Sequence, residues 1–162
     1  MGERRATLTH EGGMRFSAAT GSGRTVVFGD DVEKNEQSPI EIVATALAAC
    51  SAMDVVAIMV KKRQRPESYT IRVEAVQRSA YPQVLTSIQL LHEVTGPHVT
   101  EEAVRRCIEL SATKYCPVNA MLSAGETTIH HRYRVHRTGK APAEAEGEVI
   151  VTGPYRRPDI VE

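Results

Sequence analysis

This sequence has few large aromatic residues and no excess of either charge. It has no tryptophan and two phenylalanines among 162 residues, and 20 basic side chains balance 20 acidic ones. Few aromatic side chains offer few platforms for stacked bases, and a balanced charge gives no electrostatic attraction to a phosphate backbone. We therefore expect no nucleic-acid partner.

We also expect neither a secretory signal nor a disulfide framework. The first ten residues, MGERRATLTH, are polar and contain no apolar run of the kind that a signal peptide needs. The cysteines number three, and an odd count fits free or redox-active thiols better than a set of structural disulfides. We expect a cytoplasmic protein.

The chain does contain one long apolar stretch. Between Ile42 and Val60 the only charged side chain is Asp54. A helix that is apolar on all sides is typical of the middle of a domain. The stretch therefore predicts a long, buried central helix with Cys50 near its centre.

Both ends of this helix carry signals. The segment Ser38-Pro39-Ile40-Glu41 fits a capping box, with Ser38 as the N-cap, Pro39 in the first helical position and the Glu41 carboxylate on the Ser38 amide. Basic residues 61–63 suit the negative end of the helix dipole.

The same stretch is long enough to cross a membrane. A span would place Asp54 inside the bilayer, at a cost of about 2.5–3.5 kcal/mol. It would also be a single span between two segments that look globular. We therefore favour a buried helix in a soluble protein and expect no membrane partner.

The remaining elements follow from hydrophobic periodicity and turn residues. A second helix begins after the N-cap Thr100, and a short helix follows Pro117. Strands are predicted over residues 6–10, 14–18, 24–28, 69–77, 85–95 and 128–136. This order indicates an α+β fold with the long helix packed on an antiparallel sheet.

The chain divides at Arg137 by composition. Residues 1–136 hold all the predicted elements and form one domain. Residues 137–162 form a C-terminal tail, which starts as a linker and could end as an edge strand or as an extension that covers a partner.

Histidines and one cysteine are expected to be structural. His92 falls on the apolar face of its strand, and Cys107 falls in the apolar stripe of the second helix. The neighbours His130 and His131 point to opposite faces of their strand, with no cysteine or carboxylate spaced to join them. We therefore predict no metal and no cofactor.

Two cysteines stand in special settings. Cys50 lies inside the long helix, and Asp54 follows it by one turn on the same face, where a carboxylate disfavours a thiolate. Cys116 lies at the start of the short helix, where amide dipoles lower a thiol pKa, and Lys114 is close in sequence. These rules favour Cys116 as the thiolate, although either residue could be a buried free cysteine.

The segments PIEIVATALAACSAMDV and KYCPVNAML together resemble the OsmC/Ohr family, in an order of elements that covers roughly residues 14 to 136. The resemblance implies a small α+β protein that forms an intertwined homodimer. The form C-S-A-M-D-V looks like the less characterised branch of the family rather than its well-studied peroxidases.

For the peroxidase branches the resemblance implies thiol chemistry in oxidative stress defence. Cys50 would attack an organic hydroperoxide and become a sulfenic acid, and Cys116 would condense with it to a disulfide. An external dithiol reductant would then restore both thiols. An apolar pocket between the subunits would hold the substrate.

The sequence departs from the peroxidase pattern at the residues that activate the thiol. The family glutamate directly follows the proline, where this chain has Ile40, and the carboxylate comes one place later at Glu41. A helix turns by about 100° per residue, so Glu41 would lie opposite Cys50. The arginine candidates are Arg24, after a Gly-Ser-Gly turn, and Arg15.

These departures keep a second hypothesis open. A non-catalytic member of the family would bind a small apolar or electrophilic ligand in the dimer cleft and keep its cysteines reduced. Whether the chain is an enzyme, a thiol peroxidase, therefore depends on whether the two sulfurs come within disulfide reach.

Overall fold

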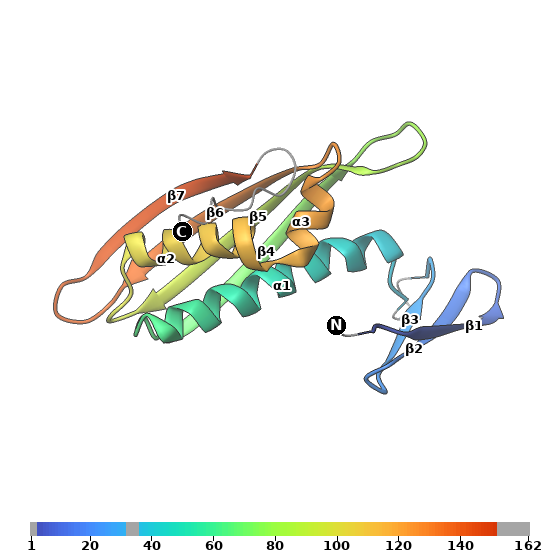
Figure 1. Ribbon diagram of the computed structural model, residues 1–162, viewed down its shortest axis with the longest axis horizontal. Helices are drawn as coiled ribbons and strands as arrows, with labels where there is room; N and C mark the ends of the chain where they lie inside the picture. The colour runs from blue at the N-terminus through green and yellow to red at the C-terminus, as the bar shows by residue number, and fades with distance from the viewer. Residues whose placement is uncertain (1–2, 32–35, 152–162) are drawn as a thin grey trace. The chain divides into compact units, whose positions relative to one another are not determined.

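The computed structural model describes residues 3–31 and 36–151 of the chain (Figure 1). The chain forms two compact units, of which the first ends at Val43 and the second begins at Ala44. Each unit is built on its own β-sheet.

The first unit is a three-stranded antiparallel meander. Its strands are β1 (Ala6–Gly12), β2 (Arg15–Thr20) and β3 (Thr25–Phe28), in the order β1-β2-β3. Gly12 and Gly13 have φ angles of 110° and 56°, which side chains rarely adopt, so the β1–β2 turn depends on glycine. The predicted meander is confirmed.

The long helix α1 (Pro39–Lys61) begins in the first unit and continues into the second. Pro39 is its first residue, and the Ser38 amide donates a hydrogen bond of 3.1 Å to the Glu41 carboxylate. This is the contact that the capping box predicts.

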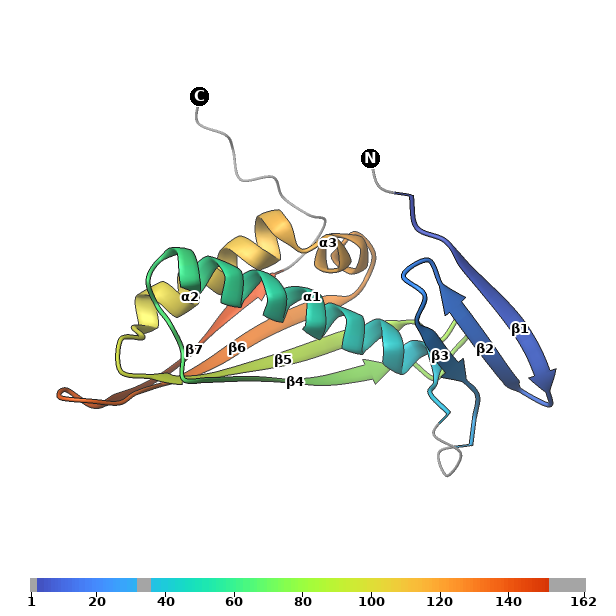
Figure 2. The same cartoon turned by 90° about the horizontal axis from the view of Figure 1, so that it is seen from below.

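The second unit is a four-stranded sheet with helices on one face. Its strands are β4 (Ser68–Gln77), β5 (Leu85–Gly96), β6 (Thr128–Arg137) and β7 (Ala143–Val151), in the order β4-β5-β6-β7. Helix α2 (Glu101–Leu110) and the second-unit part of α1 lie on the same face of this sheet (Figures 1 and 2). Val55 and Met59 of α1, Val104 and Ile108 of α2, and Val94 of β5 meet in the core.

One strand pairing differs from the predicted antiparallel sheet. Strand β6 pairs with β5 in parallel, while the β4–β5 and β6–β7 pairs are antiparallel. The reason is the connection: α2, a π-helical turn (Ser111–Tyr115) and the short helix α3 (Pro117–Ser123) return the chain to the end at which β5 began.

Helix α1 is buried on one side only, which corrects the expectation of burial on all sides. Its buried residues share one face: Ala44, Leu47, Ala48, Ser51, Val55 and Met59. Its exposed apolar residues share another, here called the outer stripe: Ala46, Ala49, Met53, Ala57 and Val60. The sheet and α2 cover one side of the helix, and Met53 on the other side is 74% exposed.

By length and composition α1 could cross a membrane. Its Val55 and Met59, however, are fully buried in the core with residues of α2, β5 and β6. This is how the core helix of a soluble protein packs, and it supports the buried-helix interpretation.

The segment after Arg137 forms a strand where the sequence suggests a linker. Strand β7 pairs with β6 along the edge of the sheet. Alternate residues of β7 are glutamates, and each contacts a side chain of β6: Glu146 forms an ion pair with Arg134, and Glu144 and Glu148 accept hydrogen bonds from the rings of His136 and His130. The sequence gives little sign of this strand, because glutamates alternate with small residues here and not with large apolar ones. Residues 152–162 of the predicted tail lie outside the described residues.

Candidate functional site

Two thiols and a carboxylate meet in the second unit. The sulfur atoms of Cys50 and Cys116 and a carboxylate oxygen of Asp54 all lie within 4.8 Å of one another. Helix α1 supplies Cys50 and, one turn later, Asp54, while Cys116 comes from the junction between the π-helical turn and α3. The structure thus brings the two predicted cysteines together, both as free thiols.

The two thiols differ in exposure. Cys50 is half-buried, whereas Cys116 is 1% exposed. The third cysteine, Cys107, is fully buried in the core between α2 and the sheet, as the sequence predicts. A reagent that enters from solvent therefore reaches Cys50 before it reaches Cys116.

Cys116 is the N-cap of α3. Its sulfur accepts a hydrogen bond of 3.3 Å from the Asn119 amide, and Pro117 follows in the first helical position. Its own amide donates a bond of 2.9 Å to the Ser111 carbonyl, which closes the π-helical turn. These two bonds fix the position of the thiol.

Burial disfavours the thiolate form of Cys116, which corrects the prediction made from its position at the start of a helix. Burial and, to a smaller extent, the hydrogen bond with Cys50 raise the pKa of Cys116 to about 12, although the Asn119 amide acts in the opposite direction. The removal of the thiolate from water outweighs the amide at the end of a seven-residue helix.

Asp54 is held by a buried hydroxyl. Ser111, the first residue of the π-helical turn, is fully buried and donates a hydrogen bond of 3.0 Å to Asp54 Oδ2. Partial burial raises the pKa of Asp54 above its usual value, and the Ser111 bond lowers it to a smaller extent. The carboxylate is therefore easier to protonate than an exposed aspartate.

A chain of buried hydrogen bonds extends from α3 across the sheet. The Asn119 side-chain amide donates to the Ala112 carbonyl at 3.0 Å, so its oxygen is free to accept from His131 Nε2 at 3.0 Å. His131 Nδ1 then accepts from His92 Nε2 at 3.1 Å, and His92 Nδ1 accepts from the Tyr69 hydroxyl at 2.6 Å. Both histidines are neutral in this arrangement.

The electrostatics of the two histidines agree with that arrangement. Burial lowers the pKa of His92 to about 3 and that of His131 to about 4, with smaller contributions from His131 and His130 respectively. The sequence predicts a satisfied His92, but it gives no sign that His92 and His131 bond to each other, because that contact depends on the parallel pairing of β5 with β6.

The other predicted site residues belong to the first unit. Arg15 forms ion pairs of 2.8 Å with Glu36 and 3.0 Å with Glu11. Arg24 is exposed, and Glu41 bonds to the helix start. Their catalytic roles stay predictions.

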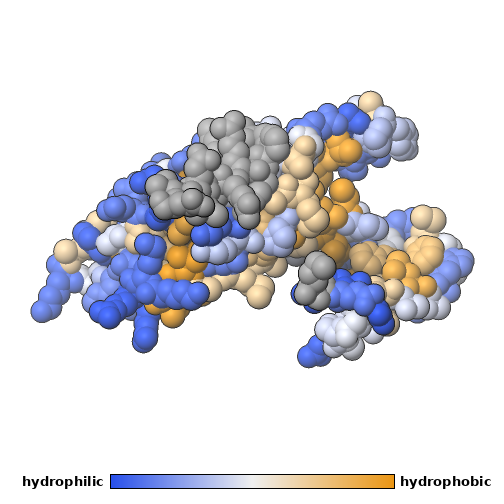
Figure 3. All heavy atoms as spheres, in the orientation of Figure 1, coloured by the Kyte–Doolittle hydropathy of each residue, from blue (hydrophilic) through white to orange (hydrophobic). Residues whose placement is uncertain are grey.

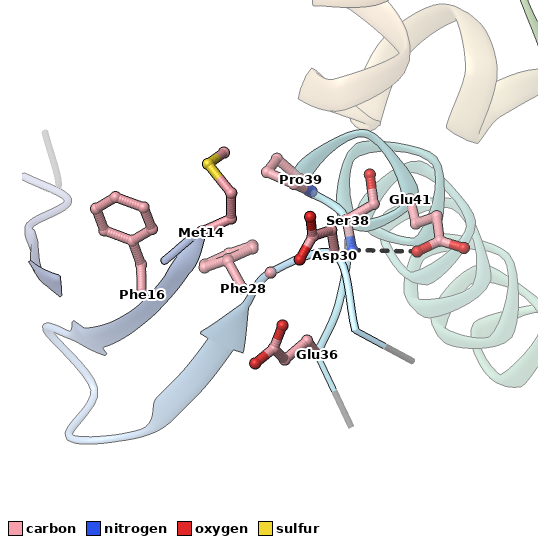
Figure 4. Close-up of a pocket in the computed structure, with 9 residues that line it drawn as sticks. Met14, Phe16, Phe28, Asp30, Glu36, Ser38, Pro39 and Glu41 are labelled. Carbon is pink, nitrogen blue, oxygen red and sulfur yellow. Dashed lines mark hydrogen bonds between the residues drawn. The ribbon is translucent and has the colours of Figure 1, made fainter. Parts of the chain in front are cut away.

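A pocket of about 650 Å³ lies in the first unit. Figure 3 shows atoms of hydrophobic residues, in orange, on the part of the chain that carries β1–β3 as well as elsewhere. Met14, Phe16 and Phe28 line one side of the pocket, and Pro39 and Glu41 of α1 lie on its other side (Figure 4). The pocket could hold a small apolar group.

The centre at Cys50 is also the one group of possible metal ligands found among residues 3–31 and 36–151. It supplies three donors, whereas a structural zinc site takes four protein ligands. Two of the three are thiols within reach of each other, so we interpret the group as a thiol centre.

Comparisons with known proteins agree with the resemblance in the sequence. A family model described as OsmC-like protein matches residues 31–132. Protein YhfA of Escherichia coli strain K12 is 35% identical over 123 residues, which are 76% of this chain and 91% of YhfA.

Solved structures show the same fold. A hypothetical protein from Aquifex aeolicus VF5 is 25% identical, with a TM-score of 0.75 over 86% of this chain and 100% of its own. An organic hydroperoxide resistance protein OsmC from Legionella pneumophila is 14% identical, with a TM-score of 0.63 over 83% of this chain and 97% of its own. At that identity the second likeness concerns the fold alone. The predicted α+β, OsmC-like fold is confirmed.

Proposed function

Since the chain belongs to the OsmC-like protein family, which supports a role in redox stress, we propose that it reduces organic hydroperoxides through Cys50 and Cys116. The observation that carries this proposal is the meeting of the two sulfur atoms within 4.8 Å. The name of the Legionella pneumophila protein, an organic hydroperoxide resistance protein, supports the substrate class.

The exposure of the two thiols supports their order of action. Cys50, which solvent reaches, attacks the peroxide oxygen, so the O–O bond breaks, an alcohol leaves and a sulfenic acid remains. Cys116 then attacks the Cys50 sulfur, and a disulfide forms as water leaves. A dithiol reductant returns both residues to thiols.

The outer stripe of α1 supports a homodimer. Its five residues are spaced by three, four, four and three positions, which is the spacing of a helix–helix contact. We propose that a second copy of the chain covers this stripe and that the substrate pocket forms there. Free cysteines fit the reducing cytoplasm, where we expect the protein to act.

Thiol titration tests the peroxidase proposal. One equivalent of an organic hydroperoxide should consume the Cys50 and Cys116 thiols and leave Cys107 reduced. The change Cys50→Ser should abolish turnover, and Cys116→Ser should leave a trapped sulfenic acid that a dimedone probe labels. Cys107→Ser is the matched control and should turn over normally. If Cys50 and Cys116 both stay reduced, the proposal is wrong.

A second candidate function is ligand binding without turnover. The apolar pocket of the first unit favours it, because that pocket is large enough for a small ligand and contains neither cysteine. This hypothesis predicts that the thiols stay reduced in the presence of peroxide and that Cys50 is alkylated slowly at neutral pH. Fast alkylation together with peroxide consumption would exclude it.

A further inference from the structure

Asp54 has no role in the two-cysteine scheme, although it lies beside both sulfurs. We infer that Asp54 is the proton-transfer group of this centre: it takes the proton from each attacking thiol and gives it to the oxygen that leaves. The inference rests on the proposed peroxide reduction and assigns that reaction a further catalytic residue.

The geometry places one carboxylate within reach of two attacking atoms. Asp54 follows Cys50 by one helical turn, and its oxygen lies within 4.8 Å of both thiol sulfurs. That range allows direct transfer after a small side-chain rotation, or transfer through one water molecule. A single group can therefore serve the attack by Cys50 and the later attack by Cys116.

Ser111 orients this carboxylate. Its hydroxyl donates to Asp54 Oδ2 at 3.0 Å, which holds the carboxylate in place beside the two sulfurs. Its carbonyl accepts from the Cys116 amide at 2.9 Å. One buried residue thus fixes Asp54 and Cys116 relative to each other, and the π-helical turn that it begins is a feature often found at functional sites.

The protonation of the three groups calls for such a base. Burial raises the pKa of Cys116 to about 12, so its thiol needs a proton acceptor before it can attack at neutral pH. Burial also raises the pKa of Asp54, which brings it closer to the range of an acid–base catalyst. Among the His, Cys, Asp and Glu side chains of the described residues, those grouped with Asp54 are Cys50 on its own helix and Cys116 after the π-helical turn.

Each step balances with Asp54 unchanged at its end. In the first step the Cys50 proton moves to Asp54 and then to the alkoxide oxygen as the O–O bond breaks, so thiol and hydroperoxide give sulfenic acid and alcohol. In the second step the Cys116 proton moves to Asp54 and then to the hydroxide that leaves Cys50, so sulfenic acid and thiol give disulfide and water.

Two oxidants with different leaving groups test the inference. tert-Butoxide is a strong base that must be protonated as it leaves, whereas acetate from peracetic acid leaves without a proton. Asp54→Asn should therefore slow the oxidation of Cys50 by tert-butyl hydroperoxide about 100-fold or more, and that by peracetic acid less than about 10-fold. Asp54→Glu should restore part of the lost rate, and Cys107→Ser should behave like the wild type.

The outcomes separate this inference from the proposal on which it rests. Equal losses with both oxidants would overturn the transfer of a proton from Asp54 to the leaving oxygen, and no loss with either would overturn its role altogether, while the peroxidase function stands. A wild type that consumes neither oxidant would instead overturn the peroxidase function. Alkylation of Cys50 by iodoacetamide would then decide the role of Asp54: Asp54→Asn slows it if Asp54 is a base and speeds it if Asp54 is merely a negative neighbour.

Discussion

At the scale of single residues, burial decides the chemistry of the thiol centre. The amide dipoles at a helix end stabilise an anion by about 0.3–1 kcal/mol. The removal of an ion from water costs several kcal/mol. Cys116 receives hydrogen bonds from amides at the start of α3 but is 1% exposed, so its thiol is stabilised over its thiolate. A sequence shows the helix end but not the burial, which is why the prediction for Cys116 was wrong.

The buried histidine pair predicts that acid destabilises the fold. Burial lowers the pKa values of His92 and His131 to about 3 and about 4, below the value of 6.5 expected in the unfolded chain. As the pH falls from 6.5 toward 4, the two histidines bind protons in the unfolded state but stay neutral in the folded state. The free energy of unfolding should therefore fall, by up to about 1.4 kcal/mol per pH unit for each histidine.

Urea unfolding at pH 7 and pH 5 measures this effect. His131→Gln, which keeps a side-chain amide in the buried chain, should flatten the pH dependence even if it lowers stability at pH 7. His98→Gln is the control, because His98 is exposed and should leave the pH dependence unchanged. Equal slopes for the wild type and His131→Gln would contradict the prediction.

At the scale of elements, local signals predict the helices better than they predict the pairing of strands. The capping box at Ser38 and the N-cap at Thr100 are both present, because a cap depends on neighbours in sequence. The parallel β5–β6 pair depends on the path of a crossover, and no local pattern encodes it. The π-helical turn is rare and has no sequence signature, so the contact of Ser111 with Asp54 could not be foreseen.

The helix cap of α1 gives a test of the role of Glu41. Glutamine can also bond to the N-cap amide, so Glu41→Gln keeps the cap and removes the charge. We expect its stability to change by less than about 0.5 kcal/mol and its peroxide turnover to stay near that of the wild type. Urea unfolding and turnover with tert-butyl hydroperoxide measure the two effects. A loss of turnover with unchanged stability would give Glu41 the catalytic role that the family resemblance implies.

At the scale of the whole molecule, the outer stripe leaves the long helix half covered. The sequence predicts a helix buried on all sides, and the single chain buries one of them. Both observations fit if a second copy supplies the missing cover. A symmetric dimer places the same stripe on both partners, so one substitution changes the contact twice.

The substitution Met53→Lys should therefore separate the subunits. Met53 is the central residue of the outer stripe and is 74% exposed in the single chain, so a lysine there leaves the monomer core intact and puts two charges into the proposed contact. Light scattering after gel filtration should give twice the chain mass for the wild type and one chain mass for the variant. Val76→Lys is the matched control: Val76 is 61% exposed and lies on β4, whose core-facing residues are the odd-numbered ones from Tyr69 to Val73.

A dimer that survives Met53→Lys would show that the stripe is not the contact, and a wild type that runs as a monomer would show that the exposed apolar face serves something other than a second copy. If the substrate pocket forms at this contact, the monomeric variant should also lose turnover with tert-butyl hydroperoxide while its Cys50 still reacts with iodoacetamide.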